Sequence, residues 1–313
     1  MVAASVIVPA RNAAATLGAT LAGLAAQEAG FEFEVIVVDD GSTDATAAVA
    51  DGAPMAVRVL RQGGLGPGPA RNAGAAVASG RALAFTDADC VPTPGWLAAG
   101  VAALEAADVV QGAVHADPGA TSGPFDRTVW VVGETGLYEC ASLFCDRELF
   151  DRVGGFEDWL DARLGKPLAE DAWFGWRARR AGARTGFSDA ALVHHVVFER
   201  DATGFVAERA RLVYFPAIAG RIPELRRSTF FGRVFLSRRT AAFDAALAAA
   251  GLGVALRSRR PLIAALPWAW MVSAEARRWG RRAPRVAAAQ AAADLVGAGA
   301  LAIGSARARS LLL

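Results

Sequence analysis

The chain has 313 residues, enough for one large domain or two modest domains with a buried core. Residues 1–220 carry 17 basic and 27 acidic side chains, whereas residues 221–313 carry 16 basic and 4 acidic ones. An acidic first part suits a site that uses a metal ion, and a basic last part suits an anionic partner such as a membrane surface or a nucleic acid. The three cysteines, Cys90, Cys140 and Cys145, lack zinc-type spacing, which argues against a disulfide scaffold and for a reducing compartment.

Short apolar runs alternate with helical patterns over the first 115 residues. The predicted strands are Ser5–Pro9, Val35–Val38, Val57–Leu60, Ala82–Phe85 and Val109–Val114. The predicted helices between them are Thr16–Gln27, Ala45–Ala50, Ala70–Ser79 and Pro94–Leu104. Strands that alternate with helices at this spacing indicate an α/β fold with a doubly wound sheet.

The pattern is looser after about residue 115. We predict a helix over Phe144–Val153, a helix over Glu170–Ala181 and a strand over Leu192–Phe198. Helices are predicted in the C-terminal region over Phe205–Ala217, Thr240–Ala250, Leu262–Arg278 and Val286–Ala302.

The strand Ala82–Phe85 runs directly into two carboxylates, Asp87 and Asp89. Open α/β sheets bind ligands at the carboxyl ends of their strands. Two neighbouring acids repel each other unless a cation lies between them, and Mg²⁺ is commonly shared between carboxylates and substrate phosphates. The pattern therefore fits a metal–nucleotide site, although taken alone it also fits a solvated turn. A second acidic pair, Asp39-Asp40, ends another strand and favours a shared site.

Seven motifs together resemble the family 2 glycosyltransferases, and the resemblance covers roughly residues 4–200. The motifs are Val8-Pro9-Ala10-Arg11-Asn12, Val37-Val38-Asp39-Asp40-Gly41-Ser42-Thr43-Asp44, Gly68-Pro69-Ala70-Arg71-Asn72-Ala73-Gly74, Thr86-Asp87-Ala88-Asp89, Val153-Gly154-Gly155-Phe156, Glu170-Asp171 and Val193-His194-His195. Each motif is weak by itself, but all seven occur in the family order. The resemblance implies a GT-A fold with a mostly parallel sheet and helices on both faces. The C-terminal region lies mostly outside the resemblance, and its predicted helices follow the catalytic fold.

The resemblance also implies which residues hold the donor, a nucleotide-diphosphate sugar. Pro9, Arg11 and Asp39 match positions at the base and ribose, and Asp40 is the second acid of that motif. Arg71 matches a segment that faces the ribose and phosphates. Asp87 matches the first acid of the metal motif, near the ribose and sugar.

The remaining matches concern the metal and the chemistry. Asp89 matches the acid that ligates Mn²⁺ or Mg²⁺. A histidine after the following strand is a metal ligand in some members, and of the two candidates we favour His195 over His194. Asp171 matches the catalytic base, with Glu170 beside it, which implies an inverting transfer to a hydroxyl acceptor.

Two features depart from the family pattern. Ala10 replaces an aromatic residue that is common in the first motif, so base stacking there is in doubt. The stretch after Asp171 is bulkier than is typical, because it contains Trp173, Phe174 and Trp176. These rings either pack in the core or line the acceptor face.

The implied organisation is a catalytic domain over residues 1–220 and a basic helical region over 221–313. The catalytic domain divides into a nucleotide-sugar half to about residue 115 and an acceptor half over 116–220. No uncharged run in the last region reaches the 20 or so residues that a bilayer span needs. We therefore expect either a packed helical cap or peripheral contact with an anionic membrane, in a cytoplasmic enzyme whose acceptor is lipid-linked or a cell-envelope glycan. No recognition motif supports nucleic acid as the partner.

Two other functions compete with this interpretation. A Rossmann dehydrogenase would need its glycine-rich loop after the first strand, but Gly64–Gly68 lies elsewhere. An inactive sugar-nucleotide binder or membrane scaffold would be expected to lack Asp89 or Asp171, and both are present.

Overall fold

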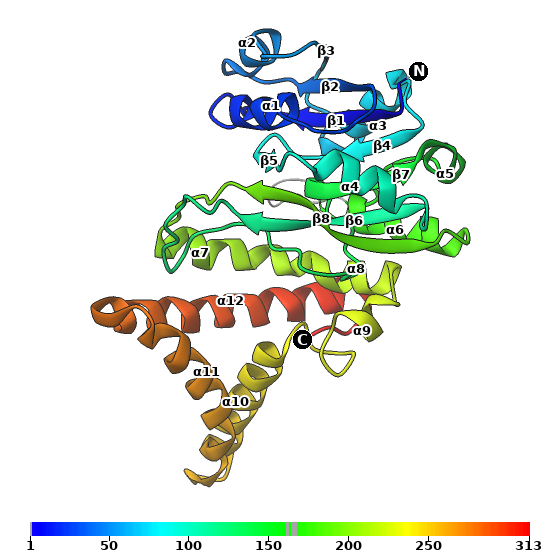
Figure 1. Cartoon of the computed structure of the whole chain (residues 1–313). Coiled ribbons are helices and arrows are strands. Elements are labelled where there is room, and N and C mark those ends of the chain that lie inside the picture. Colours follow the sequence, from blue (N-terminus) through cyan, green and yellow to red (C-terminus); the bar gives the residue numbers. More distant parts are fainter. Residues whose placement is uncertain (1, 161–162, 164–167) are drawn as a thin grey trace. The chain divides into compact units, whose positions relative to one another are not determined.

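The computed structural model describes residues 2–160, 163 and 168–313 (Figure 1). It divides into two compact units. The sheet unit comprises residues 1–121 and 128–198, and the helical unit comprises residues 122–127 and 199–313.

The sheet unit contains one eight-stranded sheet with the order β3-β2-β1-β4-β7-β6-β8-β5. The strands are β1 (Ala4–Ala10), β2 (Phe33–Asp40), β3 (Val57–Gln62), β4 (Ala82–Phe85), β5 (Cys90–Pro92), β6 (Val109–Ala116), β7 (Leu143–Asp146) and β8 (Thr185–His195). The first four strands in this order are mutually parallel, so β1, β2 and β4 have their carboxyl ends at one edge. β6 and β8 are also parallel, whereas β5 and β7 pair antiparallel with their neighbours.

Helices cover both faces of the parallel half of the sheet. Successive side chains of a strand point to opposite faces, and β2 has apolar residues on both of them. Val35 and Val37 belong to the large core cluster, which also holds Leu17 and Leu21. The alternate residues of β2 pack instead against Ala70. The helices of this unit are α1 (Leu17–Ala25), α2 (Thr46–Asp51), α3 (Pro67–Val77), α4 (Trp96–Ala103), α5 (Arg147–Val153) and α6 (Glu170–Arg180), with a 3₁₀ turn η1 (Cys140–Ser142).

The predicted helix over Phe144–Val153 is wrong in its first part. Residues 143–146 form β7, which pairs antiparallel with both β4 and β6. The helix begins only at Arg147, after Asp146, whose side chain accepts hydrogen bonds from the N–H groups of Glu148 and Leu149. An apolar run of four residues does not by itself distinguish a buried strand from a helix. Here the residues form a strand because they pair with β4 on one side and β6 on the other.

The helical unit contains α7 (Ala202–Glu208), α8 (Phe215–Arg221), α9 (Leu225–Ser228), α10 (Arg238–Ala255), α11 (Leu266–Arg277) and α12 (Ala283–Ala308). Shorter 3₁₀ segments are η2 (Arg209–Tyr214), η3 (Arg260–Ala265) and η4 (Gly280–Arg282). One core cluster of this unit brings together Phe125, Ala276, Val286 and Ala289. Figure 1 shows α10 and α11 as a hairpin joined through η3.

One helical stretch, Gly280–Ala308, is long and apolar enough to cross a membrane by length and composition. This departs from the expectation that the C-terminal region has no such stretch, because α12 remains apolar on average despite Asp294. A core helix passes the same test, and α12 buries a face that includes Val286, Ala293 and Leu301. The carboxylate of Asp294 is itself paired with the Arg239 guanidinium at 2.8 Å.

Candidate active site

Two loops at the carboxyl ends of β1 and β2 are bound to each other. The Asn12 side chain accepts a hydrogen bond from the Thr43 N–H at 2.8 Å, and the Asn12 N–H donates to the Ser42 hydroxyl at 2.9 Å. Asn12 has a φ of 50°, a left-handed conformation that asparagine tolerates better than most residues. These bonds fix the segment that carries the exposed Arg11 side chain. Pro9 lies within β1, level with Val38.

The two acids that end β2 have different surroundings. Oδ1 of Asp39 accepts from the Ser42 N–H at 3.0 Å, within its own loop. Asp40 instead holds the next glycine-rich loop, since it accepts from the N–H groups of Leu65 at 2.7 Å and Gly66 at 2.8 Å. The side chain of Gln62 also donates to Asp40 at 2.7 Å. Asp40 therefore shapes the loop that leads into α3, which sequence reasoning had not distinguished from direct contact with the donor.

Arg71 joins the two motifs that carry the acids. It lies on α3, and its guanidinium donates from Nη2 to Asp87 at 2.7 Å and from Nη1 to Glu170 at 2.9 Å. Burial lowers the pKa of Arg71, but the charges of Asp87 and Glu170 raise it, and the net pKa is above its usual value. The Asp87 side chain is 33% exposed, whereas those of Arg71 and Glu170 are below 10%. A ligand can therefore reach Asp87, while the other two groups support it.

The Val153–Phe156 motif packs directly on α3. Asn72 donates from its side-chain amide to the Phe156 carbonyl at 2.7 Å and accepts from the Phe156 N–H at 2.8 Å. Gly155 has a φ of 63°, and a Cβ there would lie 2.5 Å from the Asn72 oxygen, so this position requires glycine. The Arg71 guanidinium lies over the Phe156 ring, 5.6 Å from its centre. Residues some 80 positions apart in sequence are thus held together.

Asp171 lies in the first turn of α6, and Oδ1 accepts a hydrogen bond from the Ala172 N–H at 2.7 Å. Burial raises the pKa of Asp171 well above its usual value, and the neighbouring charge of Glu170 raises it further, against the opposing effect of Arg71. A carboxylate with a raised pKa is a stronger base than an ordinary aspartate. The preceding residue, Ala169, has a left-handed φ of 68°, which turns the chain sharply into the helix.

Asp89 and His195 lie together at the joint of β5 and β8. Oδ1 of Asp89 is 3.8 Å from Nε2 of His195. The other ring nitrogen, Nδ1, lies 2.6 Å from the Val196 carbonyl, to which it can only donate. This bond leaves the lone pair of Nε2 directed toward Asp89, so the pair fits a divalent cation. Cys90 completes a group whose possible ligand atoms lie within 4.8 Å of one another.

The aromatic residues after Asp171 are buried, as the packing interpretation requires. Phe174 contacts Phe150 and Phe156 in an aromatic cluster, with ring centres 5.4 and 4.9 Å apart. The Trp176 indole donates to the Gly136 carbonyl at 2.9 Å, and the Trp173 indole donates to Glu157 at 2.8 Å.

Sequence reasoning missed one acid at this site, Asp158. A Cβ added at Gly68, in the first turn of α3, would lie 2.9 Å from Oδ1 of Asp158 and 3.5 Å from Cγ of Glu170. Burial and the charge of Glu170 raise the pKa of Asp158. The signal available in the sequence was its position, two residues after the Val153–Phe156 motif.

The parallel strands, the acids at their carboxyl ends and the appended helices define the GT-A class of nucleotide-sugar enzyme folds. Residues 5–148 match the model of glycosyl transferase family 2, and this match together with the curated relatives supports a family 2 glycosyltransferase domain in this part of the chain.

Curated relatives agree with this assignment. The chain is 29% identical over 174 residues to glycosyltransferase AglE of Haloferax volcanii. This alignment covers 50% of this chain and 56% of that protein. It is 29% identical over 213 residues to the pre-mycofactocin glycosyltransferase of Mycobacterium tuberculosis. This alignment covers 61% of this chain and 42% of that protein. The chain thus matches only about half the length of these relatives.

Solved structures show the same fold. Residues 1–349 of TarS from S. aureus, in complex with UDP-GlcNAc, superpose with a TM-score of 0.54 at 22% identity, covering 98% of this chain and 92% of that one. Mannosyltransferase PcManGT from Pyrobaculum calidifontis, in complex with GDP-Man and Mn²⁺, gives a TM-score of 0.53 at 23% identity, covering 98% and 80%.

Proposed function

We propose that this chain transfers a glycosyl group from a nucleotide-diphosphate sugar to a hydroxyl acceptor, with inversion at the anomeric carbon. The observation that carries the proposal is Asp171, a half-buried acid with a raised pKa next to the Arg71–Glu170 pair. Arg71 in turn reaches Asp87 at the end of β4, where a donor would bind. One guanidinium thereby connects the donor site to Glu170, the residue that precedes the proposed base.

Asp171 acts in this scheme as the general base that accepts the proton of the acceptor hydroxyl. A general base contributes about 10²–10⁴-fold to a rate. The hydroxyl oxygen forms its bond to the anomeric carbon as the bond to the diphosphate oxygen breaks, so one displacement inverts the centre. Arg71 and Glu170 position Asp87, and we assign Pro9, Arg11, Asp39 and Asp87 to the donor.

Asp89 and His195 are the residues that would hold Mn²⁺ or Mg²⁺. When bound, such an ion offsets the negative charge of the leaving diphosphate without proton transfer. PcManGT, which has the same fold, was solved with GDP-Man and Mn²⁺, and this supports the proposal by likeness of fold. We also propose that residues 1–220 form the catalytic domain, that the enzyme acts in the cytoplasm, and that its acceptor is lipid-linked or a cell-envelope glycan.

The test is a screen of nucleotide sugars for release of nucleotide diphosphate in Mn²⁺ or Mg²⁺, with a mixture of lipid-linked acceptors. The proposal requires release that depends on the acceptor, and a product whose anomeric configuration by NMR is opposite to that of the donor. Binding of a nucleotide sugar without turnover of any donor would favour an inactive binder, and a retained configuration would exclude Asp171 as the base of a single displacement.

A further inference from the structure

The α10–η3–α11 hairpin of the helical unit exposes several large apolar side chains. We call residues 245–274 the hairpin tip. Its large exposed apolar side chains are Leu247, Leu252, Val254, Leu256, Leu262, Ile263, Leu266 and Trp270. Val254 is 80% and Ile263 is 72% exposed, so neither is a core residue of this unit. Apolar side chains gathered on one surface mark an interaction site.

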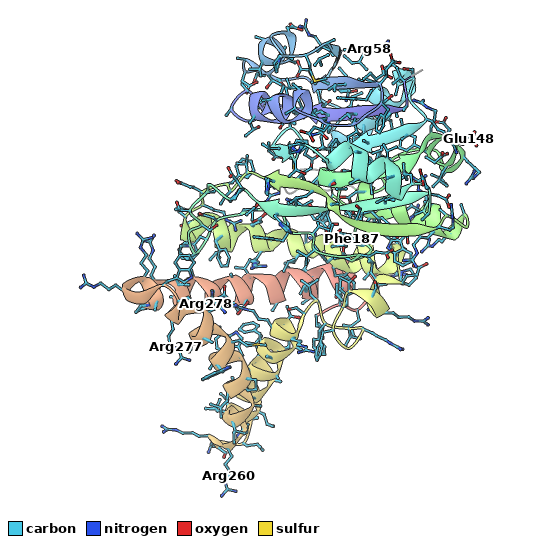
Figure 2. All side chains as sticks on the ribbon, viewed as in Figure 1. Arg58, Glu148, Phe187, Arg260, Arg277 and Arg278 are labelled. Atoms are coloured by element: carbon cyan, nitrogen blue, oxygen red, sulfur yellow. The ribbon has the colours of Figure 1, made fainter. Side chains whose placement is uncertain are left out.

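The charge of the hairpin tip has one sign. Between Asp244 and Glu275 the sequence has no acidic residue, and it has three arginines, Arg257, Arg259 and Arg260. All three are exposed, and Figure 2 shows Arg260 at the far end of the hairpin. The Arg277 guanidinium lies over the Trp270 ring, 5.2 Å from its centre, on the flank of the same helix pair.

We propose that the hairpin tip docks on the surface of an anionic lipid bilayer. Apolar side chains beside arginines, with a tryptophan at the boundary, are what an interfacial segment requires. The apolar residues enter the boundary between headgroups and acyl chains, while the arginines contact lipid phosphates. This docking is independent of the glycosyl transfer proposed above.

The charge also decides between a bilayer and a second copy of the chain. A two-fold interface places the same patch of each copy against itself. The interface would then contain the arginines at residues 257, 259 and 260 of both copies and no acidic residue of either hairpin tip, and like charges repel. An anionic surface has the complementary charge.

Docking at the hairpin tip also differs from a span through α12. The middle of α12 carries Asp294, which is paired with Arg239 and accepts a hydrogen bond from the Trp268 indole at 2.8 Å. A span would have to carry this group into the hydrocarbon or break these contacts. The hairpin tip needs no such rearrangement.

The test is flotation of the full chain with vesicles of phosphatidylcholine alone and of phosphatidylcholine mixed with phosphatidylglycerol. We expect binding to the anionic vesicles, weakened by salt. Each basic residue at such a surface is worth about 1 kcal/mol, so replacing Arg257, Arg259 and Arg260 by Gln together should weaken binding about 100-fold. Ile263→Ser should also weaken binding, and this loss should persist in high salt because apolar insertion is not screened.

Matched controls come from the sheet unit. Arg58, Arg61 and Arg81 are exposed, and their joint replacement by Gln removes the same charge. Val132 is 73% exposed, like Ile263, so Val132→Ser is the apolar control. Both controls should bind nearly as wild type. Thermal unfolding of every variant should stay close to wild type, because all the altered side chains are exposed. The contacts that the control arginines make, to Val77, Asp51 and Asp146, are on the surface and contribute little.

Four results would overturn the proposal. The first is no binding of the full chain to either kind of vesicle, and the second is an equal loss of vesicle binding in the arginine control. The third is that vesicle-bound protein resists extraction with alkaline carbonate. The fourth is self-association that Ile263→Ser abolishes, without any vesicle binding. The third would point to a span, and the fourth to a second copy of the chain.

Discussion

Nη1 of Arg71 lies 2.9 Å from Oε1 of Glu170, and both side chains are almost fully buried. Removing one partner of a buried ion pair leaves the other charge uncompensated, which typically costs 3–5 kcal/mol. Asp87 still pairs with Arg71, so Glu170→Ala should lower the free energy of unfolding by about 3 kcal/mol, at the lower end of that range. Urea denaturation measures this loss.

The control for this change is Glu148→Ala. Glu148 is an exposed acid in the first turn of α5, and Figure 2 shows its side chain pointing outward. Its loss should cost less than about 1 kcal/mol. Equal costs for the two variants would contradict the importance of the buried pair.

Asp171→Asn keeps the shape of the side chain but removes the base. It should lower kcat by about 10² or more while donor affinity survives, because the donor site lies at the strand ends. Steady-state kinetics and calorimetric titration with the nucleotide diphosphate separate the two effects. If kcat stayed within a few-fold of wild type, the base would lie elsewhere, and Glu170 would be tested next.

The raised pKa of Asp171 also sets the pH dependence of stability. The folded state binds the Asp171 proton more tightly than the unfolded state does, so proton binding stabilises the folded state. This contribution to the free energy of unfolding is fully present below the unfolded pKa of about 3.9. It is lost as the pH rises through the raised folded pKa. Asp171→Asn should therefore be more stable than wild type at neutral pH, and this difference should shrink toward pH 4 in thermal unfolding. A stability difference between the two proteins that stayed constant from neutral pH to pH 4 would contradict a raised pKa of Asp171.

Sequence patterns predicted the parallel half of the sheet well and the second half less well. The strand predicted over Leu192–Phe198 overlaps β8 only to His195, and β8 begins seven residues earlier than predicted, at Thr185. The first four residues of β8, from Thr185 to Ser188, are mostly small or polar, and they pair in parallel with β6. Local periodicity carries no information about such a partner.

The same limit applies to the candidate site. The acids at strand ends were visible in the sequence because strand ends are recognisable. The contact of Asp158 with the start of α3 depends on how the Val153–Phe156 motif packs on Asn72, which only the tertiary structure contains. Likewise, Asp40 accepts hydrogen bonds from the N–H groups of Leu65 and Gly66 because the loop before α3 returns to the end of β2. Local sequence patterns do not predict the path of such a loop.

Asp89→Ala should abolish turnover, because it removes the carboxylate assigned to the metal ion. Binding of the nucleotide diphosphate should persist but should no longer be strengthened by Mn²⁺. Calorimetric titration of the wild type and the variant, with and without Mn²⁺, measures both. Enhancement by Mn²⁺ that is unchanged in Asp89→Ala would exclude Asp89 as a ligand.

The two adjacent histidines should differ in their effect on metal use. Neighbouring strand residues point to opposite faces, and it is Nε2 of His195 that lies 3.8 Å from Asp89. Nδ1 of His194 is instead buried without a hydrogen-bond partner among the described residues. His195→Ala should weaken the Mn²⁺-dependent part of diphosphate binding at least about tenfold, since even the loss of an outer contact to a ligand costs about 10–100-fold. His194→Ala is the matched control and should leave this part almost unchanged, although it can reduce stability by opening a cavity. Manganese titrations followed by calorimetry compare the two, and equal, small effects would mean that neither histidine is a ligand.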